Sequence, residues 1–69
     1  MSAPEDLSAC AAEPYRGLVG QNEDRLETTL ILAPVRVIRP GTVVNWPPLT
    51  SRINFEISED GQVTRIFCG

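Results

Sequence analysis

Apolar and polar residues alternate most regularly in the last third of the chain. In the segment RINFEIS, residues 52–58, the apolar side chains of Ile53, Phe55 and Ile57 fall on one face and polar side chains on the other. The next four residues, EDGQ, contain an Asp-Gly pair, which is typical of a tight hairpin turn. The segment VTRIFC, residues 63–68, follows this turn. The pattern predicts two strands joined as a hairpin.

The middle of the chain predicts a helix and then another strand. Asn22 suits a helix N-cap, two acidic residues follow it, and Leu26 and Leu30 share one helical face. We therefore predict a helix over residues 23–32, which the following proline ends. The segment VRVIR, residues 35–39, is rich in β-branched residues and bounded by prolines, which predicts a buried strand.

Together these elements predict an α+β domain in which one helix packs on a small β-sheet. Residues 1–14, rich in Ala, Ser, Glu and Pro, are predicted to form an N-terminal tail that is tethered through Cys10, ahead of a domain over residues 15–69. A chain of 69 residues has room for one domain but not for a large core. A disulfide, a metal or a second copy is therefore expected to support it.

A long connection, residues 40–51, joins the first two predicted strands and contains three of the six prolines and the only tryptophan. Such connections are uncommon in compact domains and often carry function. Pro47 biases the preceding Trp46 towards an extended backbone, so the loop is stiffened before any partner binds. Trp46 is either held out for a partner or folded back onto the sheet.

Arg52 and Asn54 follow this loop on the strand face opposite the apolar one. A guanidinium group carries five hydrogen-bond donors, and an amide carries two donors and an acceptor. The two side chains could therefore act as struts that hold loop carbonyls. The alternative is a pair of solvated strand residues.

Composition excludes several kinds of chemistry. The net charge is −3, and the six basic residues, all Arg, are scattered, which argues against a nucleic-acid-binding face. The absence of His excludes Ser–His–Asp and Cys–His catalysis and an ordinary zinc site. No apolar run approaches the roughly 20 residues of a membrane span. We expect no enzyme activity, no cofactor or metal, no membrane or nucleic-acid partner, and a monomer.

Cys10 and Cys68 lie near opposite ends of the chain. We favour a disulfide that closes nearly the whole chain over two buried free thiols. In the chain-entropy model such a closure is worth about 4 kcal/mol. A disulfide persists in oxidising compartments, which favours a secreted or periplasmic protein in its mature form, although no signal-peptide pattern is visible.

Several motifs, taken in order, resemble a known family. LVGQN opens the predicted helix, VRVIRPGTVV leads into the loop, RIN ends the loop, and EDGQVTRIFCG follows. Over residues 15–69 this layout resembles the potato inhibitor I family of serine protease inhibitors, the eglin c-like proteins, and within it a disulfide-containing microbial branch of elastase inhibitors. The resemblance implies a mixed sheet whose two main strands are parallel. It also implies an exposed loop between those strands that enters a protease active site like a substrate.

By position, the resemblance implies that Trp46 fills the primary specificity pocket of a serine protease. A large aromatic side chain suits subtilisin-like or chymotrypsin-like enzymes rather than trypsin or elastase. Arg52 matches the loop-supporting arginine of the family, and Asn54 matches the second support position. The implied reactive loop, residues 43–49, consists of Val43, Val44, Asn45, Trp46, Pro47, Pro48 and Leu49.

Pro47 departs from the pattern of the family, because it makes the reactive bond an Xaa-Pro bond. Such a bond has no N–H, and the ring crowds the position from which the leaving nitrogen is protonated. Two consequences are open: the bond resists cleavage while the loop still docks, or Pro47 prevents docking. The second would leave a non-inhibitory protein-binding or structural module on the same scaffold.

Overall fold

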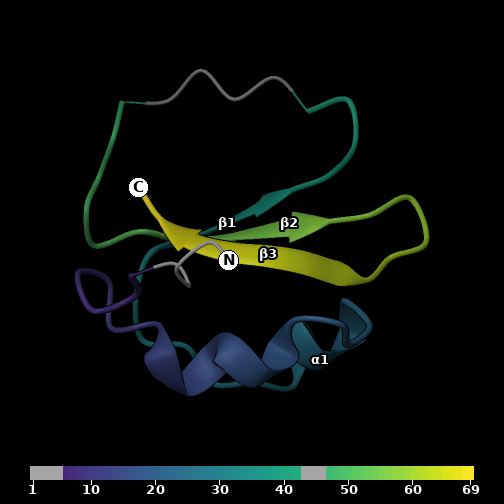
Figure 1. Ribbon diagram of the computed structural model, residues 1–69, viewed down its shortest axis with the longest axis horizontal. Helices are drawn as coiled ribbons and strands as arrows, with labels where there is room; N and C mark the ends of the chain where they lie inside the picture. The colour runs from purple at the N-terminus through teal and green to yellow at the C-terminus, as the bar shows by residue number, and fades with distance from the viewer. Residues whose placement is uncertain (1–5, 43–46) are drawn as a thin grey trace, which may run out of the picture.

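The computed structural model describes residues 6–42 and 47–69 (Figure 1). Its centre is a three-stranded sheet with the strand order β1-β2-β3. β1 (Val35–Ile38) pairs in parallel with β2 (Ile53–Ile57), and β2 pairs antiparallel with β3 (Val63–Cys68). The three predicted strands and the mixed sheet are therefore confirmed, and the protein is a small α+β domain.

The hairpin between β2 and β3 forms at the predicted turn. The N–H of Ser58 donates to the carbonyl oxygen of Gln62 at 2.9 Å, and the N–H of Gly61 donates to that of Ser58 at 2.9 Å. Gly61 has a φ of 78°, in the left-handed region that favours glycine. The Asp-Gly pair thus closes the turn because its second residue has no side chain to strain.

β2 is the central strand, and its apolar face carries the core. Its side chains Ile53, Phe55 and Ile57 are at most 4% exposed. β1 lies at the edge of the sheet, and its side chains are exposed or half-buried. The prediction of a buried strand over residues 35–39 is wrong, because Val35 is 43% exposed and the other side chains of β1 are only half-buried. Its β-branched composition suits a half-buried strand equally well.

The helix is shorter than the sequence predicts. α1 spans Asp24–Glu27, so the prediction of a helix over residues 23–32 is wrong beyond the first turn. The predicted start is close, because the side-chain oxygen of Asn22 accepts a hydrogen bond from the N–H of Asp24 at 2.9 Å. A 3-10 helix, η1 (Glu13–Leu18), which the sequence pattern does not predict, precedes α1. Figure 1 shows both helices beneath the same face of the sheet.

Two threonines compete for a backbone acceptor where the helix ends. The hydroxyl groups of Thr28 and Thr29 donate to the carbonyl oxygen of Arg25, at 3.1 and 2.6 Å, which a continuing helix would bond through a backbone N–H. Leu26 packs against the core, but Leu30 is 77% exposed. The apolar stripe expected from the two leucines is therefore absent. Of the helices that the structure describes, neither is long and apolar enough to cross a membrane.

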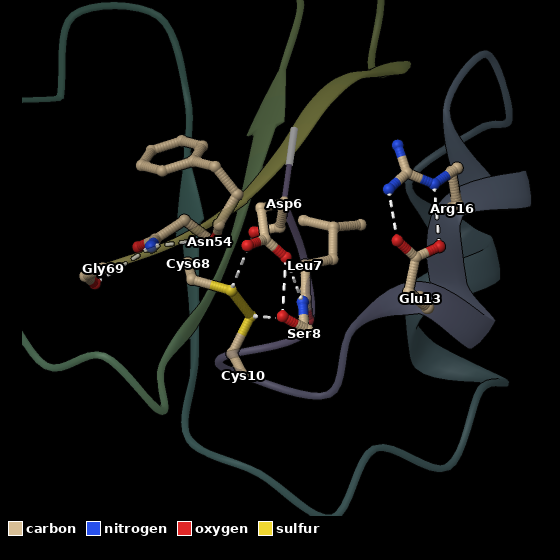
Figure 2. The surroundings of a disulfide bond; sticks show 10 residues. Asp6, Leu7, Ser8, Cys10, Glu13, Arg16, Asn54, Cys68 and Gly69 are labelled. Atoms are coloured by element: carbon tan, nitrogen blue, oxygen red, sulfur yellow. Dashed lines mark hydrogen bonds and ion pairs between the residues drawn. A yellow bond between two sulfur atoms is a disulfide. The ribbon is translucent and has the colours of Figure 1, made fainter. Parts of the chain in front are cut away.

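The N-terminal segment contributes to the core. Leu7, Cys10 and Ala12 are at most 4% exposed and belong to the same apolar cluster as β2 and β3. Cys10 forms a disulfide with Cys68, which confirms the predicted pairing (Figure 2). The segment predicted as a tail is thus packed from Leu7 onward. The boundary predicted between residues 14 and 15 stays a prediction, since packing does not define where an independent unit begins.

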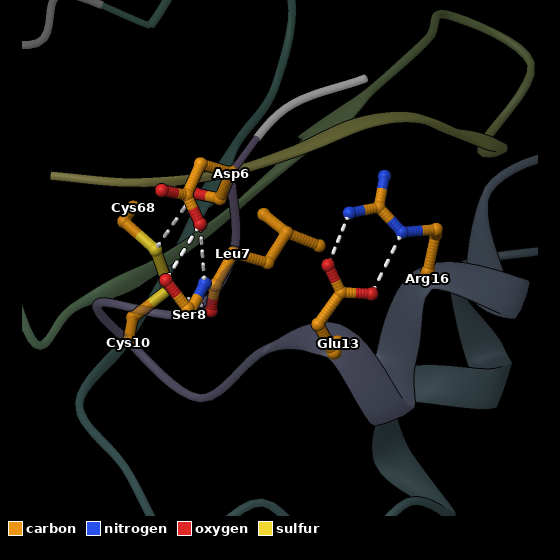
Figure 3. Close-up of polar contacts among 7 residues, drawn as sticks. All are labelled: Asp6, Leu7, Ser8, Cys10, Glu13, Arg16 and Cys68. Atoms are coloured by element: carbon orange, nitrogen blue, oxygen red, sulfur yellow. Dashed lines mark hydrogen bonds and ion pairs between the residues drawn. A yellow bond between two sulfur atoms is a disulfide. The ribbon is translucent and has the colours of Figure 1, made fainter. Parts of the chain in front are cut away.

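Polar contacts on the surface hold this N-terminal segment (Figure 3). The carboxylate of Asp6 accepts hydrogen bonds from the hydroxyl and the N–H of Ser8, at 2.6 and 3.0 Å, and these lower the pKa of Asp6 below its usual value. Arg16 forms an ion pair with Glu13 at 2.6 Å and lowers the pKa of Glu13 in the same way. Because both pKa values are lowered on folding, the contribution of these contacts to stability is present at neutral pH. It is lost as the pH falls through the lowered values.

Candidate functional site

The connection from β1 to β2 carries the predicted reactive loop. Its described parts, residues 39–42 and 47–52, lie on the side of the sheet opposite the helices (Figure 1). Pro47, Pro48 and Leu49 are exposed, which is what contact with a partner requires. The other members of the predicted reactive loop, which lie outside the described residues, are Val43, Val44, Asn45 and Trp46.

Arg52, immediately before β2, reaches both the loop and the end of β3. The residue is 9% exposed, and its Nη1 donates to the carbonyl oxygens of Pro47 at 3.3 Å and Gly69 at 3.4 Å. Its backbone is held as well. The N–H donates to the carbonyl oxygen of Leu49 at 2.9 Å, and the carbonyl oxygen accepts from the N–H of Gly69 at 3.1 Å. One residue therefore connects the exposed loop with the end of the neighbouring strand.

Asn54 lies in the centre of the sheet and is completely buried. Its Nδ2 donates to the carbonyl oxygens of Phe67 at 3.2 Å and Gly69 at 3.0 Å, and its Oδ1 accepts from Nε of Arg36 at 2.8 Å. Figure 2 shows the amide directed towards Gly69, beside the disulfide. The interpretation of Arg52 and Asn54 as solvated residues is wrong, because both are buried and hydrogen-bonded. Within the described residues, Asn54 is connected to the loop only through Gly69 and Arg52.

Two members of this network, Arg36 and Gly69, are missing from the sequence-based interpretation. Arg36 alternates with the valines of β1, which could have placed it on the polar face of the sheet. Its partner follows from the parallel register, which sets Arg36 opposite Asn54 and which the sequence does not define. Gly69 contributes a carbonyl oxygen, and every residue has one, so no sequence signal marks it.

The network contains donors that fix carbonyl oxygens, and it leaves the loop side chains Pro47, Pro48 and Leu49 turned outwards to solvent. Within residues 6–42 and 47–69, no group of three or more His, Cys, Asp or Glu side chains could hold a metal ion. An arrangement of this kind restrains an exposed segment, which lowers the entropy that the segment would lose on binding. The class of protein that this property suits is a binding protein.

Comparison with known proteins makes this class specific. Among solved structures, the fold is similar to that of the elastase inhibitor AFUEI, with a TM-score of 0.70 and 26% sequence identity over 93% of this chain and 100% of that chain. Comparison with curated proteins found no significant match. The model of the peptidase inhibitor I78 family matches residues 10–69, so the chain belongs to this family. It is a protease inhibitor and not an enzyme.

These findings bear on the predicted resemblance in two ways. Protease inhibition and the similarity to an elastase inhibitor are confirmed. Membership in the potato inhibitor I family stays a prediction, because the matching family model is that of the I78 inhibitors.

Proposed function

We propose that the protein inhibits serine proteases by inserting residues 43–49 into the active site as an extended, substrate-like segment. Trp46 fills the primary specificity pocket, as in the mechanism implied by the resemblance to potato inhibitor I. The observation that carries this proposal is the hydrogen bond from Nη1 of Arg52 to the carbonyl oxygen of Pro47, at 3.3 Å. It restrains the residue that follows the proposed reactive bond between Trp46 and Pro47.

Restraint of this residue favours inhibition for two reasons. Ordering the backbone of one residue costs about 1–2 kcal/mol, so a loop that is held before binding loses less entropy in the complex. The same hydrogen bond holds Pro47 close to the active site if the reactive bond is hydrolysed. Re-formation of the bond then competes with release of the cleaved loop.

Trp46 supports a target with a large apolar pocket. An indole side chain suits chymotrypsin-like and subtilisin-like enzymes, whereas the buried acid of trypsin and the small pocket of elastase do not match it. AFUEI is an elastase inhibitor. We therefore propose that the two proteins differ in target through the residue that enters this pocket. The disulfide supports a site of action outside the cell or in the periplasm.

The proposal is tested by titrating subtilisin, chymotrypsin, elastase and trypsin with the oxidised protein while the mixtures are followed by mass spectrometry. We expect stoichiometric loss of subtilisin or chymotrypsin activity with only very slow cleavage after Trp46, because Pro47 protects the bond. Inhibition of elastase alone would overturn the assignment of Trp46. No inhibition of any of the four enzymes, with the fold intact, would overturn the proposal and favour the non-inhibitory module.

Replacement of Arg52 by methionine is expected to weaken inhibition about 10- to 100-fold and to accelerate cleavage of the loop. Methionine keeps most of the aliphatic stem but removes the donors, and hydrogen bonds from a charged group contribute about 1.5–3 kcal/mol each. Inhibition constants and the rate of loop cleavage measure the effect. Arg25→Met, the same change on exposed α1, is the matched control and is expected to inhibit like the parent. Equal inhibition by both variants would contradict a supporting role for Arg52.

A further inference from the structure

The side chain of Arg36 reaches from the edge strand β1 to Asn54 on the central strand β2. We propose that Arg36 is a positioning residue for the reactive loop and that it acts through Asn54, an inference that rests on the proposed function. The bond from its Nε to Oδ1 of Asn54, at 2.8 Å, is shorter than those by which Asn54 and Arg52 hold carbonyl oxygens. It is also the only described link of this network that starts on β1.

The bond fixes which way the amide of Asn54 points. Nε of Arg36 can only donate, so the Asn54 atom that faces it must be the oxygen. The other amide atom faces two carbonyl oxygens, those of Phe67 and Gly69, so it must be the nitrogen. Both sides of the amide thus require the same orientation. That orientation directs a donor at Gly69.

Gly69 transmits this orientation to the loop. Its carbonyl oxygen accepts from Nδ2 of Asn54 at 3.0 Å and from Nη1 of Arg52 at 3.4 Å, and the same Nη1 donates to Pro47. A connected set of hydrogen bonds therefore runs from β1 through β2 and the end of β3 to the loop. Displacing Gly69 changes the position of one of the two described acceptors of Nη1 of Arg52.

Loss of the Arg36 donor removes the hydrogen bond to Asn54, at the buried end of this set of hydrogen bonds. Asn54 is completely buried, so its Oδ1 would be left without a partner among the described residues. A buried polar atom without a hydrogen bond is unfavourable, and without the Arg36 donor the amide loses its restraint on the β1 side and is expected to shift within its site. Such a shift weakens the bond from Nδ2 to Gly69, so an acceptor of Arg52 loses one of its restraints.

The role requires only Nε of Arg36, not its charge. Nη1 of Arg36 is buried and, within the described part of the chain, has no hydrogen-bond partner. Glutamine carries its side-chain nitrogen on the same carbon that carries Nε in arginine, so Arg36→Gln keeps the donor and removes the unpartnered Nη1. Arg36→Met places a methyl group at that position and keeps the stem. The two variants therefore differ in this donor and in the amide oxygen that glutamine carries beside it.

The experiment measures inhibition constants, loop cleavage rates and thermal unfolding for both variants, against whichever protease the parent inhibits. We expect Arg36→Met to weaken inhibition about tenfold and to accelerate loop cleavage by a similar factor. Arg36→Gln is expected to stay within about threefold of the parent in both measurements. Equal behaviour of the two variants would overturn the role of the Nε donor, whether both match the parent or both are weakened.

A core variant separates positioning from general stability. Val63 is 1% exposed at the hairpin end of β3, so Val63→Ala lowers the melting temperature through a core cavity. We expect this variant to inhibit like the parent when it is assayed well below its melting temperature. If Val63→Ala weakens inhibition as much as Arg36→Met, the effect of Arg36 is one of stability and the proposal is overturned.

Hydrogen exchange distinguishes failure of this inference from failure of the proposed function. If the parent inhibits no protease, the proposed function fails, and exchange of the backbone amides of residues 49–52 still measures how firmly the loop is held. Faster exchange there in Arg36→Met than in Arg36→Gln upholds the positioning role. Equal exchange in the two variants overturns it.

Discussion

Replacement of Trp46 by glycine is expected to weaken inhibition of the target protease by about 30- to 1,000-fold while thermal unfolding stays close to that of the parent. Buried aromatic residues at the centre of an interface often account for about 2–4 kcal/mol of binding, which corresponds to that range. Trp46→Asp is expected to inhibit still less, because a carboxylate would have to enter an apolar pocket. Inhibition constants and melting curves of the same preparations measure the two effects.

The matched control for Trp46 is a large apolar residue on another part of the surface. Leu32 is 87% exposed in the connection before β1, so Leu32→Gly removes an exposed side chain without touching the loop. It is expected to inhibit like the parent, and Trp46→Phe is expected to retain most of the inhibition. If Trp46 instead packs on the sheet, its truncation costs about 3–5 kcal/mol of stability. A large fall in melting temperature for Trp46→Gly would therefore contradict its assignment to the specificity pocket.

Removal of the disulfide is expected to produce the largest loss of stability in this protein. Cys10 and Cys68 are separated by 58 positions, and closing a loop of this size contributes about 4 kcal/mol in the chain-entropy model. A small domain has a total stability of about 5–10 kcal/mol, so the melting temperature is expected to fall by about 20 °C. Circular dichroism melts with and without a reductant measure this change.

The double variant Cys10→Ala and Cys68→Ala is the companion to chemical reduction. Alanine avoids burying a hydroxyl group at Cys10, which is 4% exposed. The variant should melt near the temperature of the reduced parent and should not respond to reductant. Cys68 directly precedes Gly69, so we also expect weaker inhibition below the melting temperature. An unchanged melt after verified reduction would contradict a stabilising role for the disulfide.

The parts of the fold that could be predicted are those whose signals are local. The alternation of Ile53, Phe55 and Ile57 and the Asp-Gly pair before Gln62 define the hairpin within a few residues. The predicted helix is too long, because the spacing of Leu26 and Leu30 fits a helix regardless of which residues lie between them. The threonine hydroxyl groups that donate to the carbonyl oxygen of Arg25 compete with the backbone N–H that would continue the helix. Spacing alone does not reveal that competition.

The candidate site was predicted in part for the same reason. The alternation of β2 predicts that Arg52 and Asn54 lie on the polar face of the sheet. Their burial depends on the end of β3 and on the loop, which cover this face and which the alternation does not reveal. The partnership of Arg36 with Asn54 comes from the register of two strands that are far apart in the sequence. Likewise, Leu7 is the only leucine in a segment that is rich in Ala, Ser, Glu and Pro. No periodic apolar pattern surrounds it, so the sequence does not predict that it is part of the core.

The disulfide joins the two sides of the proposed reactive bond. Cys10 belongs to the fragment that would end at Trp46, and Cys68 belongs to the fragment that would begin at Pro47. Hydrolysis would therefore yield one two-chain molecule instead of two products that diffuse apart. The new ends would remain at high effective concentration, which favours religation. Because the disulfide keeps both fragments in one molecule, this nicked form would migrate with the intact protein on a non-reducing gel. Hydrolysis of the reactive bond is then a reversible opening of the ring that the disulfide closes.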